Sequence, residues 1–462
     1  MSGLLISAAH KSSGKTTVSI GLCAALSARG LAVQPFKKGP DYIDPMWLSR
    51  AAGRPCLNLD PYLTSWDDIR SMFRSAGRGA DLCLVEGNKG LYDGLALDGS
   101  NSNAALAAQL ELPVVLVLDA RGMTRGIAPL ILGYQAFDRN IRIAGVILNN
   151  LGGSRHESKL RQVIEHYTEV PVIGALQCAA VLAVSERHLG LIPGNEAEDA
   201  DQRVAAIGRQ VAAQVDLDRL LAAAATAPTR PAAIPLLAPR RTGQRMRIGI
   251  ARDRAFGFYY ADDLAALERA GAELLPFDTL ADSCLPAVDG LFIGGGFPES
   301  FAAALAANSA LRHDIRRAIE GGLPTYAECG GLMYLSRSLT TGEQTHPMVG
   351  VIPGDVVMQR KPVGRGYVHL AATGDFPWGA AAGKQVRAHE FHYSAIGNLP
   401  ADSRYAWKVE RGHGIDGSND GIVVHNLLAS YTHLRTAGGC NWPEHFLDFV
   451  RGCHAQALAA VA

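Results

Sequence analysis

The sequence predicts an α/β protein made of two parts, each built on a mainly parallel β-sheet. Short apolar runs, often β-branched and bounded by glycine, proline or asparagine, alternate with longer helix-like stretches. Buried parallel strands show this continuous apolar pattern because helices cover both faces of their sheet. The alternation stops once and then restarts, and a chain of 462 residues has room for two to three domains.

The apolar runs of the first part lie at 3–9, 31–36, 81–86, 112–119, 143–149 and 170–176. The segment 222–245 is rich in alanine, proline and arginine without any period, which predicts a linker. The pattern restarts with apolar runs at 247–253, 272–278, 288–296 and 323–329 and helix-like stretches at 260–271 and 299–320. We therefore expect one domain at 1–221 and a second at 246–462.

The composition excludes several classes of protein. Lys+Arg and Asp+Glu balance at 44 each, so there is no electrostatic reason to expect nucleic acid or an acidic membrane as partner. Eight scattered cysteines without a C-x-x-C pair argue against a disulfide framework and a structural zinc site. The N-terminus lacks a basic region, and no apolar run reaches the roughly 18 residues of a membrane span. We expect a soluble, cytoplasmic protein.

A phosphate-binding loop is predicted directly after the first strand. The sequence "AHKSSGKTT" matches the P-loop pattern at Gly14, Lys15 and Thr16, with Thr17 next and Ala9 in place of the first glycine. A loop that enters a helix directs backbone N–H groups at phosphate oxygens, and the helix dipole favours their charge. We expect ATP here, with Lys15 at the β- and γ-phosphates and the Thr16 hydroxyl on Mg²⁺.

Acidic side chains in two segments would complete the Mg²⁺ site with Thr16. Asp41 and Asp44 lie in "GPDYIDP", where the glycine and two prolines predict a loop rather than a helix, just after a pair of lysines. Glu86 ends a buried strand, which is where α/β sheets bind ligands. Mg²⁺ prefers such oxygen ligands. The sequence therefore predicts that these acids bind the metal or the substrate.

Two further residues are weaker candidates. Asp93 follows Glu86 in the glycine-flanked segment "EGNKGLYDG" and would face the same site. Asn149 ends another strand and would suit contact with the adenine edge, but it serves equally well as a turn residue.

A second kind of chemistry is predicted near residue 329. Cys329 follows a strand and precedes Gly330 and Gly331, so the backbone can turn sharply and expose the sulfur as a nucleophile. The glycine run at 293–299 would offer N–H groups to an oxyanion, and one such donor contributes about 10²–10³ in rate. His433 in "ASYTHLR" would accept the thiol proton.

Seven motifs in this order resemble the cobyrinic acid a,c-diamide synthase family over nearly the whole chain: "GPDYIDP", "VEGNKGLYDG", "SERHLGL", "IGGGFPE", "ECGG", "RAHEFHYS" and "ASYTHL". Members of this family are glutamine-dependent amidotransferases of corrinoid synthesis. The resemblance implies an N-terminal P-loop NTPase-like domain similar to dethiobiotin synthetase. It implies a C-terminal domain similar to class I glutamine amidotransferases.

The resemblance also implies a reaction. ATP phosphorylates the a and c acetate side chains of cobyrinic or hydrogenobyrinic acid, Cys329 releases ammonia from glutamine, and ammonia displaces the phosphate. Tyr42 and Asp44 would grip substrate and nucleotide, with Glu86 and Asp93 opposite. The expected partners are glutamine, ATP and a carboxylated tetrapyrrole, and a homodimer is left open.

The sequence departs from the family pattern at several positions. Class I glutaminases carry a glutamate two residues after the histidine, where this chain has Arg435, so something else must orient His433. Asn88 and Lys89 replace a more apolar pair, which raises a related tetrapyrrole such as sirohydrochlorin or sirohaem as an alternative substrate. The charged residues Arg387, His389, Glu390 and His392 are unusually dense for a surface strand and have no assigned role.

Two rival functions share the first domain. A partition-type ATPase also begins with a variant P-loop, but its signature lysine would lie where this chain has His10, and it has no cysteine–histidine domain. A carboxylase like dethiobiotin synthetase has no need of Cys329. Glutamine hydrolysis that depends on Cys329 separates an amidotransferase from both.

Overall fold

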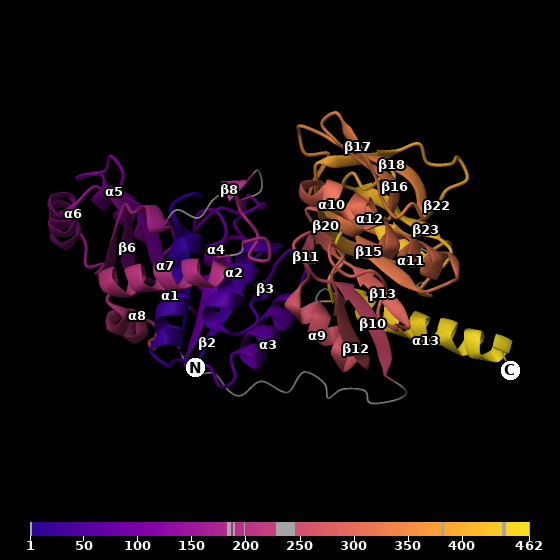
Figure 1. Cartoon of the computed structure of the whole chain (residues 1–462). Helices are drawn as coiled ribbons and strands as arrows, with labels where there is room; N and C mark the ends of the chain where they lie inside the picture. Colours follow the sequence, from indigo (N-terminus) through magenta and orange to yellow (C-terminus); the bar gives the residue numbers. More distant parts are fainter. Residues whose placement is uncertain are drawn as a thin grey trace. The chain divides into compact units, whose positions relative to one another are not determined.

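The computed structural model describes residues 2–182, 186–187, 190–197, 199–227, 245–379, 383–436 and 440–461. The chain divides into two compact units, Met1–Leu236 and Leu237–Ala462, and each has its own sheet and core (Figure 1). All eight cysteines are free. No helix within the described ranges is long and apolar enough to cross a membrane.

The first unit is built on a seven-stranded sheet in the order β3-β2-β4-β1-β5-β6-β7, and every neighbouring pair is parallel. Its strands are β1 (Ser2–Ala8), β2 (Val33–Lys38), β3 (Leu57–Leu59), β4 (Leu82–Glu86), β5 (Val114–Asp119), β6 (Ile143–Leu151) and β7 (Val172–Gln177). A two-stranded ribbon, β8 (Glu186–Arg187) and β9 (Gly190–Leu191), is separate from it. The six predicted strands of this unit are confirmed, and β3 is an addition.

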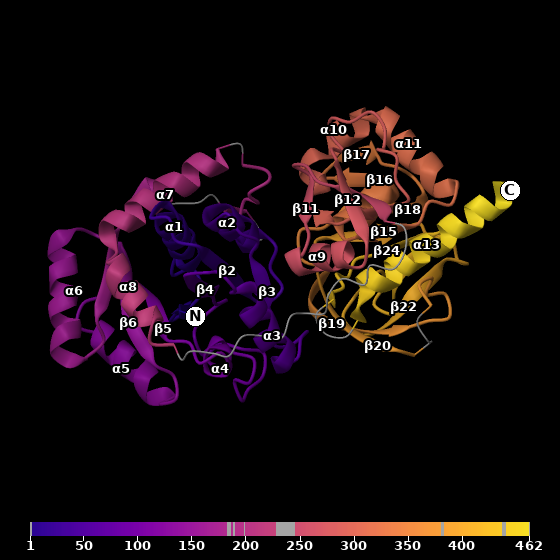
Figure 2. The ribbon, with the colours of Figure 1, turned by 90° about the horizontal axis from the view of Figure 1, so that it is seen from below.

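Helices cover both faces of this sheet, as the continuous apolar strands predict. They are α1 (Lys15–Ala28), α2 (Ile43–Ala52), α3 (Trp66–Ala76), α4 (Asn103–Gln109), α5 (Ile127–Phe137), α6 (Ser154–Tyr167), α7 (Ala200–Gln214) and α8 (Leu217–Ala224), with a 3₁₀ turn, η1, at Ala180–Leu182. Helices α1, α2 and α7 pack together on one face, whereas α3 to α6 enclose the core of the other (Figure 2).

The parallel order has a direct consequence for the site. The carboxyl ends of β1, β2 and β4 lie side by side at one edge of the sheet, because β4 pairs with both β1 and β2. The phosphate loop, the segment after Lys38 and the segment after Glu86 all leave the sheet at this edge. Open α/β sheets bind their ligands at such an edge.

The second unit contains a nine-stranded mixed sheet in the order β12-β10-β13-β15-β24-β23-β22-β19-β20. Its strands are β10 (Met246–Ala251), β12 (Ala272–Phe277), β13 (Gly290–Ile293), β15 (Thr325–Glu328), β19 (Gly364–Ala372), β20 (Gln385–His392), β22 (Arg404–Arg411), β23 (Asn419–Val424) and β24 (Leu427–Ser430). The strands from β12 to β24 are parallel, and those from β24 to β20 are antiparallel.

Smaller sheets and helices complete this unit. Two further sheets contain β11 (Phe256–Phe258) with β14 (Gly295–Gly296), and β16 (Ser336–Thr341), β17 (Gln344–Pro347), β18 (Ile352–Met358) and β21 (Ser394–Gly397). The helices are α9 (Ala261–Arg269), α10 (Ala302–Ala307), α11 (Ser309–Glu320), α12 (Gly330–Leu335) and α13 (Trp442–Val461), with a 3₁₀ turn, η2, at Pro298–Phe301. Helices α9 and α13 contribute to one core, and α10 to α12 to the other.

Two local predictions need correction. Residues 39–45 do not stay in a loop, because α2 begins at Ile43 and includes Pro45 in its first turn. Proline is tolerated there since the first N–H groups of a helix have no acceptor inside it. Asp41 Oδ1 accepts two of these groups, the N–H of Ile43 at 2.9 Å and of Asp44 at 3.1 Å.

The predicted linker begins too early. Helix α8 continues to Ala224, because its alanines favour a helix and the Asp216 side chain caps it by accepting the N–H of Arg219 at 2.9 Å. Most of the remaining linker, 228–244, lies outside the described residues.

Candidate active sites

The phosphate loop has the geometry that the P-loop motif predicts. Gly14 has φ 88°, and α1 begins at the next residue, Lys15. A Cβ at Gly14 would lie 2.1 Å from Asn149 Nδ2. Both the positive φ and this close approach therefore require glycine here. Asn149 donates to the backbone oxygen of Ser13 at 2.9 Å, and this amide group therefore supports the loop from β6. Its predicted contact with adenine stays a prediction.

Lys15 lies at this loop with its side chain largely buried. Burial lowers the pKa of Lys15 to about 8, although the charge of Glu86 opposes the shift. A buried ammonium group gains most from an anionic partner, because little water competes for it. The environment of Lys15 therefore suits phosphate binding. The neighbouring Thr17 hydroxyl donates to the backbone oxygen of Leu182 at 3.4 Å, so its nucleotide contact stays a prediction.

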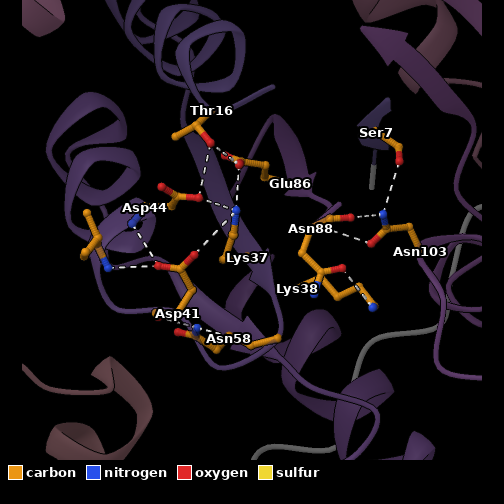
Figure 3. Close-up of polar contacts among 12 residues, drawn as sticks. Ser7, Thr16, Lys37, Lys38, Asp41, Asp44, Asn58, Glu86, Asn88 and Asn103 are labelled. Atoms are coloured by element: carbon orange, nitrogen blue, oxygen red, sulfur yellow. Dashed lines mark hydrogen bonds and ion pairs between the residues drawn. The ribbon is translucent and has the colours of Figure 1, made fainter. Parts of the chain in front are cut away.

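A cluster of polar residues lies beside the phosphate loop, and we call it the Lys37 cluster: Thr16, Lys37, Asp41, Asp44 and Glu86 (Figure 3). Lys37 Nζ donates to Glu86 Oε1 at 2.7 Å and to Asp44 Oδ2, and lies 3.8 Å from Asp41 Oδ2. The Thr16 hydroxyl contacts the same two acids, at 2.7 Å from Glu86 Oε1 and 3.2 Å from Asp44 Oδ2. The three acids are those predicted from the sequence, whereas the central lysine was not predicted as a site residue.

The charged residues of the Lys37 cluster shift one another's pKa values. Burial alone would lower the pKa of Lys37, but Asp44, Glu86 and Asp41 raise it well above its usual value. Burial would raise the pKa of Asp44, yet the Lys37 ammonium lowers it. For Glu86, which is fully buried, burial prevails over Lys37 and raises the pKa. Lys37 is thus a permanent cation among these carboxylates.

The cluster fits a Mg²⁺ ion in part. Glu86 Oε2 is buried and has no hydrogen-bond partner among the residues that the structure describes, which leaves one carboxylate oxygen for a cation. In the same residues no group of three or more His, Cys, Asp or Glu side chains is arranged to hold a metal by itself. Mg²⁺ usually takes several ligands from water and substrate phosphates, so a site in which the protein contributes only Glu86, Asp44 and Thr16 would fit it. Asp41 fits less well, because its Oδ1 caps α2.

The segment after β4 is organised by a buried asparagine that the sequence analysis missed. Asn103 donates to Ser7 Oγ at 3.3 Å and to the backbone oxygens of Gly90 and Asn88, and accepts the N–H of Asn88 at 3.1 Å. Asn88 Oδ1 in turn accepts a hydrogen bond from Lys38 Nζ at 3.1 Å. The unexpected Asn88 therefore ties this segment to the end of β2.

Two further predicted residues of this site, Asp93 and Tyr42, differ in their exposure. Asp93 is exposed and accepts the N–H of Gly90 at 2.8 Å, within the same segment. Tyr42 directly precedes α2 and is largely buried. Their roles toward substrate stay predictions.

In the second unit, Cys329 lies at a sharp turn between β15 and α12. Its φ of 48° and ψ of −100° are unusual for a residue with a side chain, and such strain is common at functional sites. A Cβ at Gly331 would lie 2.2 Å from the backbone oxygen of Ile293, and one at Gly330 would lie 3.0 Å from the backbone nitrogen of Gly296. The two glycines thus let the turn pack against the glycine run 293–299, whose role toward an oxyanion stays a prediction.

His433 lies next to this cysteine in a buried setting. Burial would lower the pKa of the imidazole, but hydrogen bonds with Cys329 and Glu328 outweigh it and raise the pKa of His433 to about 10. His433 Nδ1 lies 3.1 Å from Glu328 Oε2. The structure therefore brings the predicted nucleophile and base together, and it adds a carboxylate that the sequence analysis did not name.

Part of the segment "RAHEFHYS", on β20, lies beside this pair. The ring of His389 stacks on that of His433, with centroids 4.9 Å apart. His392 stacks on Tyr431 at 3.9 Å, and Glu390 accepts the N–H groups of His413 and Gly414. Of these residues, His389 contacts His433 directly, whereas Arg387 lies exposed on the edge strand β20.

Comparisons with known proteins match a known domain in each unit. The CobQ/CobB/MinD/ParA nucleotide binding domain matches residues 5–190, and the CobB/CobQ-like glutamine amidotransferase domain matches residues 247–439. The cobyrinate a,c-diamide synthase of Magnetococcus marinus is 47% identical over 97% of each chain. That of Methanosarcina acetivorans is 43% identical over 93% of this chain and 92% of its own. The chain belongs to the cobyrinate a,c-diamide synthase family.

Membership of the cobyrinate a,c-diamide synthase family confirms the resemblance and both predicted domain types. The nucleotide-binding match includes the phosphate loop and the Lys37 cluster, and the amidotransferase match includes Cys329 and His433. A partition-type ATPase and a simple carboxylase are set aside, because neither has an amidotransferase domain. Among solved structures, PurLQS from Thermotoga maritima is 18% identical with a TM-score of 0.36, over 45% of this chain and 99% of that chain.

Proposed function

We propose that this enzyme is an ATP- and glutamine-dependent ligase that amidates the a and c acetate side chains of cobyrinic acid or hydrogenobyrinic acid. One observation carries the proposal: a single chain holds a phosphate-loop site and a cysteine–histidine site, each inside the matching domain type. The names of its relatives support a cobyrinate substrate. Sirohydrochlorin or sirohaem is the alternative, raised by Asn88 and Lys89.

In the first unit the reaction activates a carboxylate, which is a poor electrophile at neutral pH. An oxygen of the substrate acetate attacks the γ-phosphorus of ATP, the bond to ADP breaks, and an acyl phosphate forms. Lys15 and the N–H groups at the start of α1 hold the phosphates. Tyr42, Asp44 and Asp93 position the substrate, and the Lys37 ammonium offsets its negative charge.

The protein ligands for Mg²⁺ in this proposal are Thr16, Asp44 and Glu86, with Asp41 beside them. When bound, the ion neutralises charge on the phosphoryl group that is transferred. The observation that supports this role is the buried Oε2 of Glu86, which has no hydrogen-bond partner within the described part of the chain.

In the second unit the sulfur of Cys329 attacks the amide carbon of glutamine while His433 holds the thiol proton. The C–N bond breaks, ammonia leaves with a proton from His433, and a thioester remains that water hydrolyses to glutamate. N–H groups of the run 293–299 stabilise the oxyanion. The ammonia nitrogen then attacks the carbonyl carbon of the acyl phosphate and displaces phosphate, which yields the amide.

Replacing Glu86 with glutamine is expected to weaken Mg²⁺–ATP turnover. Losing a residue that only orients a metal ligand typically costs roughly 10- to 100-fold, and losing a ligand itself should cost at least as much. The amide keeps the shape but removes the charge that suits a cation. The measurement is kcat/KM for Mg²⁺–ATP in ammonia-driven amidation. Glu157→Gln is the matched control, since Glu157 pairs with Arg161 on α6. Kinetics unchanged in Glu86→Gln would remove Glu86 from the proposed metal site.

The substrate is tested with a panel of cobyrinic acid, hydrogenobyrinic acid and sirohydrochlorin, with ATP and glutamine present. Mass spectrometry counts the amides formed on each. We expect two amides on a cobyrinate ring and none on sirohydrochlorin. Amidation of sirohydrochlorin alone would replace the proposed substrate with the alternative.

Two expectations accompany this proposal. A cytoplasmic location agrees with the use of ATP and with eight free cysteines. A homodimer stays a prediction, which sedimentation equilibrium of the purified chain would test.

A further inference from the structure

We propose that Glu328, the residue directly before the nucleophile, is the acid that positions His433 for glutamine hydrolysis. The glutaminase then works with Cys329, His433 and Glu328 rather than with cysteine and histidine alone. This inference rests on the glutaminase step of the proposed function. Class I glutaminases carry an acid two residues after the histidine, where this chain has Arg435, and Glu328 would take the place of that acid.

The carboxylate of Glu328 is fixed at three points. Oε2 lies 3.1 Å from His433 Nδ1, and Oε1 accepts the Tyr326 hydroxyl at 2.6 Å and the N–H of Leu434 at 3.0 Å. The side chains of Glu328 and His433 are each only 4% exposed. A carboxylate held in this way has little freedom to leave the imidazole, and in a buried setting its bond to a charged partner is stronger than in water.

The fold explains why this position can serve. Side chains alternate along a strand, so Tyr326 and Glu328 lie on the same side of β15, and Cys329 follows at the turn. Strand β24 runs parallel beside β15 and ends at Ser430, opposite Glu328, and His433 follows three residues later. The carboxyl ends of two adjacent strands therefore deliver the nucleophile, the acid and the base to one place.

Other charged residues nearby are engaged elsewhere. Arg435, at the position of the usual acid, donates to Asp262 at 2.6 Å and lies over the Tyr260 ring. Asp263 accepts the N–H of Thr436 at 2.8 Å. Burial and the neighbouring His433 depress the pKa of His389 well below its usual value, so the stacked imidazole adds no charge to the site.

This arrangement determines which nitrogen of His433 reacts. Nδ1–H donates to Glu328, so Nε2 faces Cys329 and accepts the thiol proton, while the Nδ1 proton stays in place. The Glu328 carboxylate then balances the charge of the imidazolium that forms. The same logic applies to the acid of a serine protease triad, where the wrong tautomer costs about 10⁴ in kcat.

Glu328→Gln is the direct test. We expect kcat for glutamine hydrolysis to fall about 10²- to 10⁴-fold with KM for glutamine nearly unchanged, since a positioning residue acts on the chemical step. The charged imidazole of His433 also loses its carboxylate partner, so the alkaline limb of the pH–rate profile should move to lower pH. Glu328→Asp keeps the charge on a shorter side chain. It should recover part of the lost kcat and reverse part of the shift of the alkaline limb.

Controls separate positioning from a structural effect. Tyr326→Phe removes one partner of Oε1 but keeps the carboxylate, and should change kcat less than about 10-fold. Near-ultraviolet circular dichroism checks the fold of each variant, and Glu328→Asp carries the test if Glu328→Gln does not fold.

Three results would be decisive. Wild-type kcat or an unmoved alkaline limb in a folded Glu328→Gln variant, or wild-type kcat in a folded Glu328→Asp variant, would overturn the role of Glu328. In that case hydrolysis that still depends on Cys329 would leave the proposed glutaminase intact. A wild-type enzyme that hydrolyses no glutamine would instead refute the proposed function itself.

Discussion

Replacing Lys15 with alanine is expected to abolish amidation with either glutamine or ammonia as the nitrogen source. Lys15 is a buried cation at the start of α1, and the nearby Lys37 is already paired with Asp44 and Glu86. Losing one partner of a buried charge pair costs about 2–5 kcal/mol, which corresponds to a loss of about 30- to 5,000-fold in kcat/KM for ATP. The measurement is ADP release and amide formation with each nitrogen source.

The control for this prediction is Lys159→Ala, which removes an exposed lysine of α6 in the same unit. It should keep both activities. Ammonia-driven amidation that survives in Lys15→Ala would contradict a reaction that begins with ATP at this loop.

Replacing Cys329 with alanine should abolish glutamine-driven amidation and leave ammonia-driven amidation intact. The sulfur is the only proposed nucleophile for glutamine, and removing the nucleophile of a covalent mechanism can cost about 10⁶-fold in kcat. The phosphate loop and the Lys37 cluster belong to the first unit and keep their residues. The measurement compares amide formation with glutamine and with ammonium salts at saturating ATP.

Cys440→Ala is a matched control, since Cys440 is also buried in the second unit and burial raises the pKa of its thiol to about 12. It should keep both activities. If Cys329→Ala lost the ammonia-driven reaction as well, the assignment of the two steps to separate sites would be wrong.

The features predicted from sequence are those that depend on neighbouring residues along the chain. The phosphate loop is specified by Gly14 and Lys15 after a strand, and the cysteine turn by Cys329 and the two glycines after another. Each needs only a strand, a turn and a helix in succession, so a local motif suffices to predict it. The parallel strands of the first unit were predictable for the same reason, because continuous apolar runs mark them.

The features that the sequence analysis missed depend on which strands become neighbours. Lys37 lies next to Glu86 because β2 pairs with β4, and Glu328 reaches His433 because β15 pairs with β24. The local pattern of apolar residues does not determine which strands become neighbours in a sheet. The antiparallel half of the second sheet was missed because strands such as β19 and β22 are partly exposed and lack long apolar runs.

The start of α2 was misjudged for a different reason. Two prolines and a glycine favour a loop. A helix forms nevertheless, because Asp41 accepts two N–H groups at the start of the helix and Pro45 lies in its first turn. The same helix start brings Asp44 beside Thr16. A pattern typical of loops therefore concealed the element that places a proposed metal ligand.

The central claim is that ATP converts the substrate carboxylate into an acyl phosphate before ammonia attacks it. Transfer of oxygen from the substrate to phosphate tests this claim most directly. The acetate carboxyls of cobyrinic acid are labelled with ¹⁸O, the enzyme is supplied with ATP and glutamine, and the inorganic phosphate is analysed by mass spectrometry. Activation through an acyl phosphate predicts one labelled oxygen in phosphate for each amide formed. Amide formation with unlabelled phosphate would contradict it.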